Sequence, residues 1–178
     1  MLFRSTKGYY KPYFITLRFN SIELDRSVAP IESAQEYRFF NEHTWNTYSI
    51  FYRFLISNLD KHYNKKLHIL PLTYDFFDVD GTREAGNSVT FSPNTLPHIH
   101  SIYLVHTDTE KKFSELAKND FNSILYQRTQ MWRYVKHFNA IPIDTPYEIN
   151  MPTVVSYASK FWDTPAARTI RYRSEEHT

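Results

Sequence analysis

Two histidines separated by one apolar residue, His98-Ile99-His100, constrain the fold of this chain more than any other feature. They lie within Leu96–Val105, a stretch rich in residues that favour β-strands. Successive side chains of a strand point to opposite faces of a sheet, so both imidazoles point to the same face. A lone strand histidine is usually structural, but two on one face are costly to bury unless something pairs with them. The pattern therefore predicts a sheet that carries part of a metal site on one face.

The rest of the chain alternates between strand and helix patterns. We expect strands at 13–19, 67–79, 97–106 and 130–138, a short strand at 88–91, and helices at 33–61, 109–126 and 153–162. Pro152 is expected at the start of the last helix. The order predicts an α+β domain in which an antiparallel sheet is covered on one face by helices. The length of 178 residues fits a single domain.

Composition limits the chemistry that is open to the chain. There are no cysteines, which excludes disulfides, thiol catalysis and cysteine-ligated zinc. The net charge of +2 is too small to indicate nucleic-acid binding by itself, so any basic surface must be local. No apolar run approaches the roughly 18 residues of a membrane helix, and the N-terminus lacks the apolar core of a secretion signal. We expect a cytoplasmic protein with no membrane partner.

The last six residues, 173–178, have the sequence RSEEHT. They resemble the peptide that results when a common sequencing adapter is translated as coding DNA. The segment before them, 169–172, has the pattern of a strand that is cut short. We therefore expect one domain over 1–172, a non-native tail over 173–178 and a missing native C-terminal region. His177 is excluded from site reasoning on this ground.

Two histidines need a harder third ligand, and the preceding strand offers carboxylates. Asp78 and Asp80 share a face if that strand is regular, whereas Asp75 lies on the other face. We favour Asp78, then Asp80, then Glu84. Asp80 precedes Gly81, which makes it a good turn former as well.

A set of two histidines and one carboxylate with open positions accepts Mg²⁺ or Mn²⁺. Nitrogen ligands favour Mn²⁺, and cellular abundance favours Mg²⁺. Such an ion polarises a phosphate oxygen and fixes the phosphorus for attack. His106 points to the same face as the pair but lies about 20 Å from His100 along an extended strand, so we do not expect it to be a ligand.

A tyrosine and a lysine lie one helical turn apart in Tyr157-Ala158-Ser159-Lys160. A phenol with a pKa near 10 needs help from a metal or a base to act as a nucleophile. Tyr157 is the candidate nucleophile, and the Lys160 ammonium can stabilise the phenolate or the charge on a phosphate. The alternative is a packed tyrosine beside a solvated lysine. A second Tyr-x-x-Lys at 63–66 shows that the spacing alone is not specific.

Three segments in this order, Phe14–Phe19, Pro97–His100 and Tyr157–Lys160, resemble the motifs of the HUH endonuclease superfamily, specifically the single-tyrosine rolling-circle replication initiators. The resemblance spans about residues 10–172. It implies a ferredoxin-like or RRM-like sheet with the histidines on a central strand. It also implies metal-dependent, sequence-specific nicking and joining of single-stranded DNA through a 5′-phosphotyrosine, which initiates replication of a plasmid or phage. The implied partners are single-stranded DNA or an origin hairpin, together with host replication proteins.

Other functions stay open. Single-tyrosine transposases share the motif order, and Tyr9-Tyr10 keeps a relaxase order open. A non-catalytic single-stranded nucleic-acid binder would use exposed aromatic and basic side chains. The candidate DNA contacts are Arg18, Arg168 and Arg171, and further bases are Lys61, Lys65, Lys66, Arg128, Arg133 and Lys136. A 2H phosphoesterase would need a second histidine motif, and a zinc hydrolase of the His-Glu-x-x-His type would need a helix that the sequence lacks.

Overall fold

The computed structural model describes residues 10–19, 34–79, 97–119, 135–144 and 146–159. Its elements are, in chain order, β1 (Tyr10–Phe19), α2 (Ala34–Leu59), the short 3₁₀ helices η1 (Tyr63–Lys65) and η2 (Leu67–Ile69), β2 (Leu72–Val79), β3 (Pro97–His106), α3 (Thr107–Asn119), β4 (Val135–Pro142) and α5 (Tyr147–Ala158). No helix in these ranges is long and apolar enough to cross a membrane.

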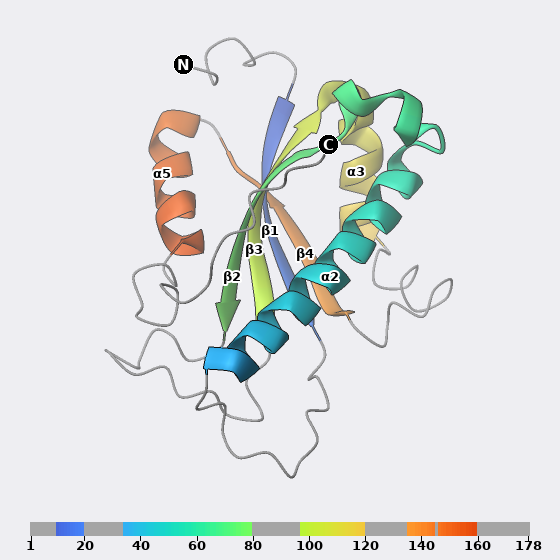
Figure 1. Cartoon of the computed structure of the whole chain (residues 1–178). Helices are drawn as coiled ribbons and strands as arrows, with labels where there is room; N and C mark the ends of the chain where they lie inside the picture. Colours follow the sequence, from blue (N-terminus) through green and yellow to red (C-terminus); the bar gives the residue numbers. More distant parts are fainter. Residues whose placement is uncertain (1–9, 20–33, 80–96, 120–134, 145, 160–178) are drawn as a thin grey trace.

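The four strands form one sheet in the order β2-β3-β1-β4. Every neighbouring pair is antiparallel. Two strand–helix–strand units interleave in this order, which is the ferredoxin-like arrangement. The predicted α+β class with an antiparallel sheet is confirmed, and the histidine strand β3 lies inside the sheet. Helices α2 and α3 lie on one side of the sheet and α5 lies on the other (Figure 1). Helices therefore cover both faces, where the sequence predicts one.

The main core lies between the sheet and helices α2 and α3. Alternate residues of β1 and β3 point into it, and they meet the buried side of α2 and Phe113 of α3. The fully buried members include Ile15, Leu17, Ile99, Tyr103, Val105, Phe51, Leu55 and Phe113. The period of two along the strands and the spacing of apolar residues along α2 account for this layer.

A second, smaller core lies on the other face of the sheet. Ile102 and Leu104 of β3 are buried there with Ile143. Helix α5 packs on them through residues spaced by four and three positions, Tyr147, Met151 and Val154. Helix α5 therefore covers Ile102 and Leu104 on this face, whereas Leu72, Tyr74 and Ile141 stay about half exposed there.

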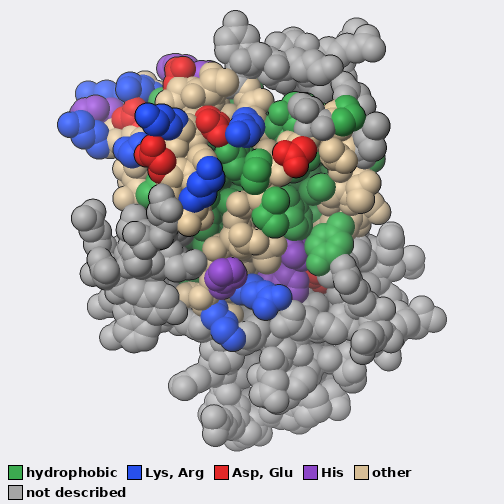
Figure 2. Space-filling model, turned by 180° about the vertical axis from the view of Figure 1, so that it is seen from behind, with side chains coloured by type: hydrophobic (Ala, Val, Ile, Leu, Met, Phe, Trp, Pro, Cys, Tyr) green, Lys and Arg blue, Asp and Glu red, His purple; other side chains and the backbone are tan. Residues whose placement is uncertain are grey.

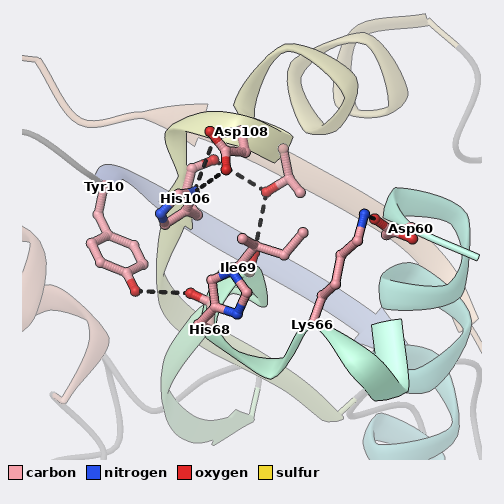
Figure 3. Close-up of polar contacts among 8 residues, drawn as sticks. Tyr10, Asp60, Lys66, His68, Ile69, His106 and Asp108 are labelled. Carbon is pink, nitrogen blue, oxygen red and sulfur yellow. Dashed lines mark hydrogen bonds and ion pairs between the residues drawn. The ribbon is translucent and has the colours of Figure 1, made fainter. Parts of the chain in front are cut away.

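Strand β2 begins later than the sequence predicts. Residues 67–69 form η2, and its end is tied to the sheet and to α3 by backbone carbonyls (Figure 3). The Tyr10 hydroxyl donates to the carbonyl of His68 at 3.3 Å, and the Thr109 hydroxyl donates to that of Ile69 at 3.4 Å. Lys66 forms an ion pair with Asp60 at 2.8 Å at the start of this segment. These carbonyls are used by side chains, so the segment does not need a strand partner.

Two further boundaries differ from the expected ones. Strand β4 extends to Pro142, because it is an edge strand and a proline there sacrifices no central ladder bond. Helix α5 starts at Tyr147, so Pro152 lies inside it rather than at its first turn. The contacts of Tyr147, Met151 and Val154 with the sheet outweigh the one backbone hydrogen bond that a proline cannot donate. The expected strand at 88–91 and the helix ends at 120–126 and 160–162 lie outside the described residues.

Candidate metal centre

The pairing register of β2 and β3 positions the candidate ligands. Asp78 is the Cα partner of His98, and Phe76 is the partner of His100. Opposite residues of an antiparallel pair point to the same face, so Asp78 joins the two histidines on the α5 face. The expectation that Asp78 shares this face while Asp75 does not is confirmed.

The three side chains meet around one carboxylate oxygen. His98 Nε2 lies 3.2 Å from Asp78 Oδ2, and His100 Nε2 lies 3.5 Å from the same atom. The two imidazole rings are 4.8 Å apart between centroids and meet edge to face. Asp78, His98 and His100 are 0%, 5% and 4% exposed, so the cluster is enclosed by protein.

These separations fit a small divalent ion. One possible ligand atom from each residue lies within 4.8 Å of the others. Octahedral coordination at 2.0–2.1 Å places adjacent ligands about 3 Å apart, so small rotations of the side chains would close them around an ion. Within the described ranges, this is the one group of three such side chains with that geometry.

A threonine from the neighbouring strand orients one of the histidines. Thr16 of β1 is the Cα partner of His100, and its Oγ1 lies 3.2 Å from His100 Nδ1. The Phe14 ring stacks on the same imidazole at 5.3 Å. With Nδ1 engaged by Thr16, the other ring nitrogen faces Asp78, as in metal sites where an outer residue fixes the tautomer of a histidine ligand. Sequence reasoning did not find Thr16, because the pairing of β1 with β3 is not visible in a single sequence.

Tyr157 lies against the same cluster. It is in the last turn of α5, is 38% exposed, and its ring meets His100 edge-on at 5.2 Å. The ring also contacts Phe14 at 5.9 Å. The packing of Met151 and Val154 on the sheet sets this position. The structure thus brings together the histidines, the carboxylate and the tyrosine that the sequence singles out.

The other candidate residues are distributed differently. Arg18 lies exposed on β1, where it is the Cα partner of His98. His106 lies at the far end of β3, 3.6 Å from the Asp108 carboxylate and against the ring of Tyr10, so it is not part of the cluster (Figure 3). Outside the described residues lie Lys160, Arg168, Arg171, Asp80, Glu84 and His177.

A different polar cluster occupies the opposite face. The Tyr48 hydroxyl donates to Asp75 Oδ1 at 2.5 Å, and the Thr73 hydroxyl donates to Oδ2 at 2.8 Å. Tyr103 lies 2.8 Å from the Tyr48 hydroxyl. Burial raises the pKa of Tyr48 and of Tyr103 well above the usual 10.0, so both stay neutral donors. Asp75 is therefore held by hydroxyls on both of its oxygens, whereas Asp78 faces two imidazoles.

Comparison with protein-family models, with curated proteins and with solved structures finds no significant match to this chain. What the chain offers is a small α+β fold with an antiparallel sheet and a buried Asp-His-His group that is able to bind a metal. Both features are compatible with a site of the HUH type.

Proposed function

We propose that this chain is a metal-dependent endonuclease that nicks and rejoins single-stranded DNA through Tyr157, as a rolling-circle replication initiator does. One observation carries the proposal. The centroid of the Tyr157 ring lies 5.2 Å from that of His100, which forms the candidate metal-binding group with His98 and Asp78. A tyrosine beside a group that can hold a divalent metal suits attack on a phosphodiester.

The proposed step is a transesterification. The phenolic oxygen of Tyr157 attacks the phosphorus and gives up its proton to a base or to solvent. A new O–P bond forms, and the bond from phosphorus to the 3′ oxygen breaks. The leaving oxygen takes up a proton and becomes a free 3′-OH, while the 5′ phosphate stays on the protein. Attack of a 3′-OH on the phosphotyrosine reverses the step and rejoins the strand.

The other residues in and around the cluster have separate proposed roles. Asp78, His98 and His100 would hold the ion, and Mn²⁺ or Mg²⁺ would supply the positive charge that polarises the phosphate. Thr16 and Phe14 keep the His100 ring in place. Lys160 keeps its proposed role of stabilising charge on the phenolate or the phosphate.

A covalent-adduct assay tests the proposal. The full chain is incubated with Mn²⁺ and a pool of random and hairpin-containing single-stranded DNA, labelled at the 3′ end in one sample and at the 5′ end in another. We expect a denaturation-resistant adduct that carries the 3′-end label only, because the tyrosine retains the 5′ phosphate. The adduct should fall below about 1% of wild type in Tyr157→Phe and in EDTA, as expected when the nucleophile or the metal is removed.

Tyr74→Phe is the matched control. Tyr74 lies on the same face of the sheet, is 51% exposed, and is four residues from Asp78 on β2. Tyr74→Phe also removes a phenolic hydroxyl, and it should leave the amount of adduct unchanged. An adduct that persists in Tyr157→Phe would contradict the assignment of the nucleophile. Binding of the pool without any adduct would contradict nicking and favour the non-catalytic binder.

A further inference from the structure

Four polar side chains line up across the sheet in one register row. Asp78 of β2 pairs with His98 of β3, His98 pairs with Arg18 of β1, and Arg18 pairs with His137 of β4. Paired residues of antiparallel strands point to the same face, so all four lie on the face that α5 shares. The row therefore begins at the metal cluster and ends at the opposite edge of the sheet.

The two halves of the row differ in solvent exposure. Asp78 and His98 are buried, whereas Arg18 and His137 are exposed. In the next row, Thr16 pairs with the exposed Asn139 of β4. The exposed half of the two rows therefore consists of hydrogen-bond donors.

Among the described residues, no acidic side chain forms an ion pair with this donor surface. Within the described ranges, neither Arg18 nor His137 forms an ion pair or a side-chain hydrogen bond. Figure 2 shows histidine and cationic side chains next to one another, below an apolar area, on the side of the molecule that faces away in Figure 1. The chain has a net charge of only +2, so a local group of this kind is where an anion would be attracted.

We propose that Arg18 and His137 form a phosphate-binding row that holds the backbone of a single DNA strand on the β1–β4 side of the metal cluster. This inference rests on the proposed function and assigns a path to its substrate. Neighbouring strands are about 4.8 Å apart, so Arg18 lies one strand and His137 two strands, about 10 Å, from His98. A strand bound at the cluster thus reaches both side chains through the phosphates next to the scissile one.

The chemistry of the two residues fits this role. Arginine presents a planar fork of donors that matches phosphate oxygens. An imidazole has at least one N–H donor in either tautomer, and the Asn139 amide adds a further donor beside it. Contacts of this type position a strand without reading its bases, so they would act on any sequence.

Binding to oligo(dT) tests the row apart from cleavage. Fluorescence anisotropy is measured with the full chain carrying Tyr157→Phe, in EDTA, over a series of salt concentrations. We expect Arg18→Gln to weaken binding about tenfold and to reduce the salt dependence by about 0.7 in log–log slope, as for one lost phosphate contact on a single strand. His137→Leu should weaken binding by roughly threefold, as for one lost neutral donor.

Two controls keep the test sharp. Lys111→Gln removes an exposed charge from α3, on the other face of the sheet, and should leave binding within about twofold of the parent. Arg18→Lys keeps the charge and should keep the salt slope. Thermal melts of each variant check that the sheet is intact.

The outcomes distinguish a failure of the proposed phosphate-binding row from a failure of the proposed nicking activity. If Arg18→Gln and His137→Leu bind like Lys111→Gln, or if the parent chain does not bind oligo(dT), the proposed phosphate-binding row is wrong even where the adduct assay succeeds. If both variants weaken binding in the expected order, the row is supported, and an adduct assay that fails would then count against nicking alone.

Discussion

Strand β2 has one carboxylate on each face of the sheet, and the two carboxylates have different hydrogen-bonding partners. Asp75, on the side of α2, accepts hydrogen bonds on both oxygens from the hydroxyls of Tyr48 and Thr73. Asp78, on the side of α5, meets two imidazoles at one oxygen. Hydroxyl groups with a raised pKa stay protonated, so they donate hydrogen bonds to a carboxylate and occupy its oxygens. Imidazole nitrogens are instead able to bind a metal together with a carboxylate.

The two faces also differ in how they are covered. The face under α2 and α3 carries the larger core. The other face carries a smaller core under α5, the candidate metal-binding cluster and the exposed row of Arg18 and His137. One face therefore holds most of the core, and the other holds the candidate functional site. The following predictions test this division, from the largest expected effect to the smallest.

Truncating a core residue on each side should give unequal losses of stability. Phe51 is fully buried against Phe138, so Phe51→Ala should lower the free energy of unfolding by about 4 kcal/mol. Met151 is only partly buried under α5, so Met151→Ala should cost about 1 kcal/mol. Urea denaturation measures both. Equal costs would show that the two layers contribute alike.

The same substitution at the two carboxylates should also separate the faces. Asp75→Asn replaces an oxygen that accepts a hydroxyl hydrogen bond with an amide that donates, so we expect a loss of about 2 kcal/mol. Asp78→Asn, measured in EDTA, should change stability by less than about 1 kcal/mol, because its amide oxygen can replace the single oxygen that both imidazoles face. Urea denaturation of both variants reports the difference, and a larger loss at Asp78 would reverse the comparison.

The outer contact of His100 should affect metal affinity and leave the fold intact. Thr16→Val removes the hydroxyl beside His100 Nδ1 at nearly constant shape and should weaken Mn²⁺ binding about tenfold. Thr16→Ser keeps the hydroxyl and should restore the affinity. Isothermal titration measures the affinities, and ¹⁵N NMR of the imidazoles reports whether the tautomer of His100 changes. Unchanged affinity and tautomer in Thr16→Val would remove the positioning role of this residue.

Local periodicity was enough to predict part of this site. Alternation along one strand places His98 and His100 on the same face, and alternation along another separates Asp78 from Asp75. The class of fold follows from the order of strands and helices. The predicted start of the last helix was wrong, because the prediction gave Pro152 more weight than the contacts that Tyr147 and the rest of α5 make with the sheet.

The features that sequence reasoning missed depend on contacts between segments that are far apart in the chain. The Thr16 hydroxyl contacts His100, and Arg18 is the Cα partner of His137, although these pairs are 84 and about 119 positions apart in the chain. A shift of one residue would send either side chain to the other face. The contact between Tyr48 and Asp75 likewise depends on how α2 packs on the sheet, which a single sequence does not reveal.

A titration with Mn²⁺, followed by the EPR signal of the free ion, tests the central claim that Asp78, His98 and His100 form a metal site. The account predicts one saturable site in the wild-type chain and in Asp108→Asn, which alters the exposed carboxylate beside His106. It predicts an affinity at least about 100-fold weaker in Asp78→Asn, as expected for the loss of a charged ligand. Wild-type protein without a saturable site, or Asp78→Asn that binds Mn²⁺ as tightly as wild type, would contradict the account.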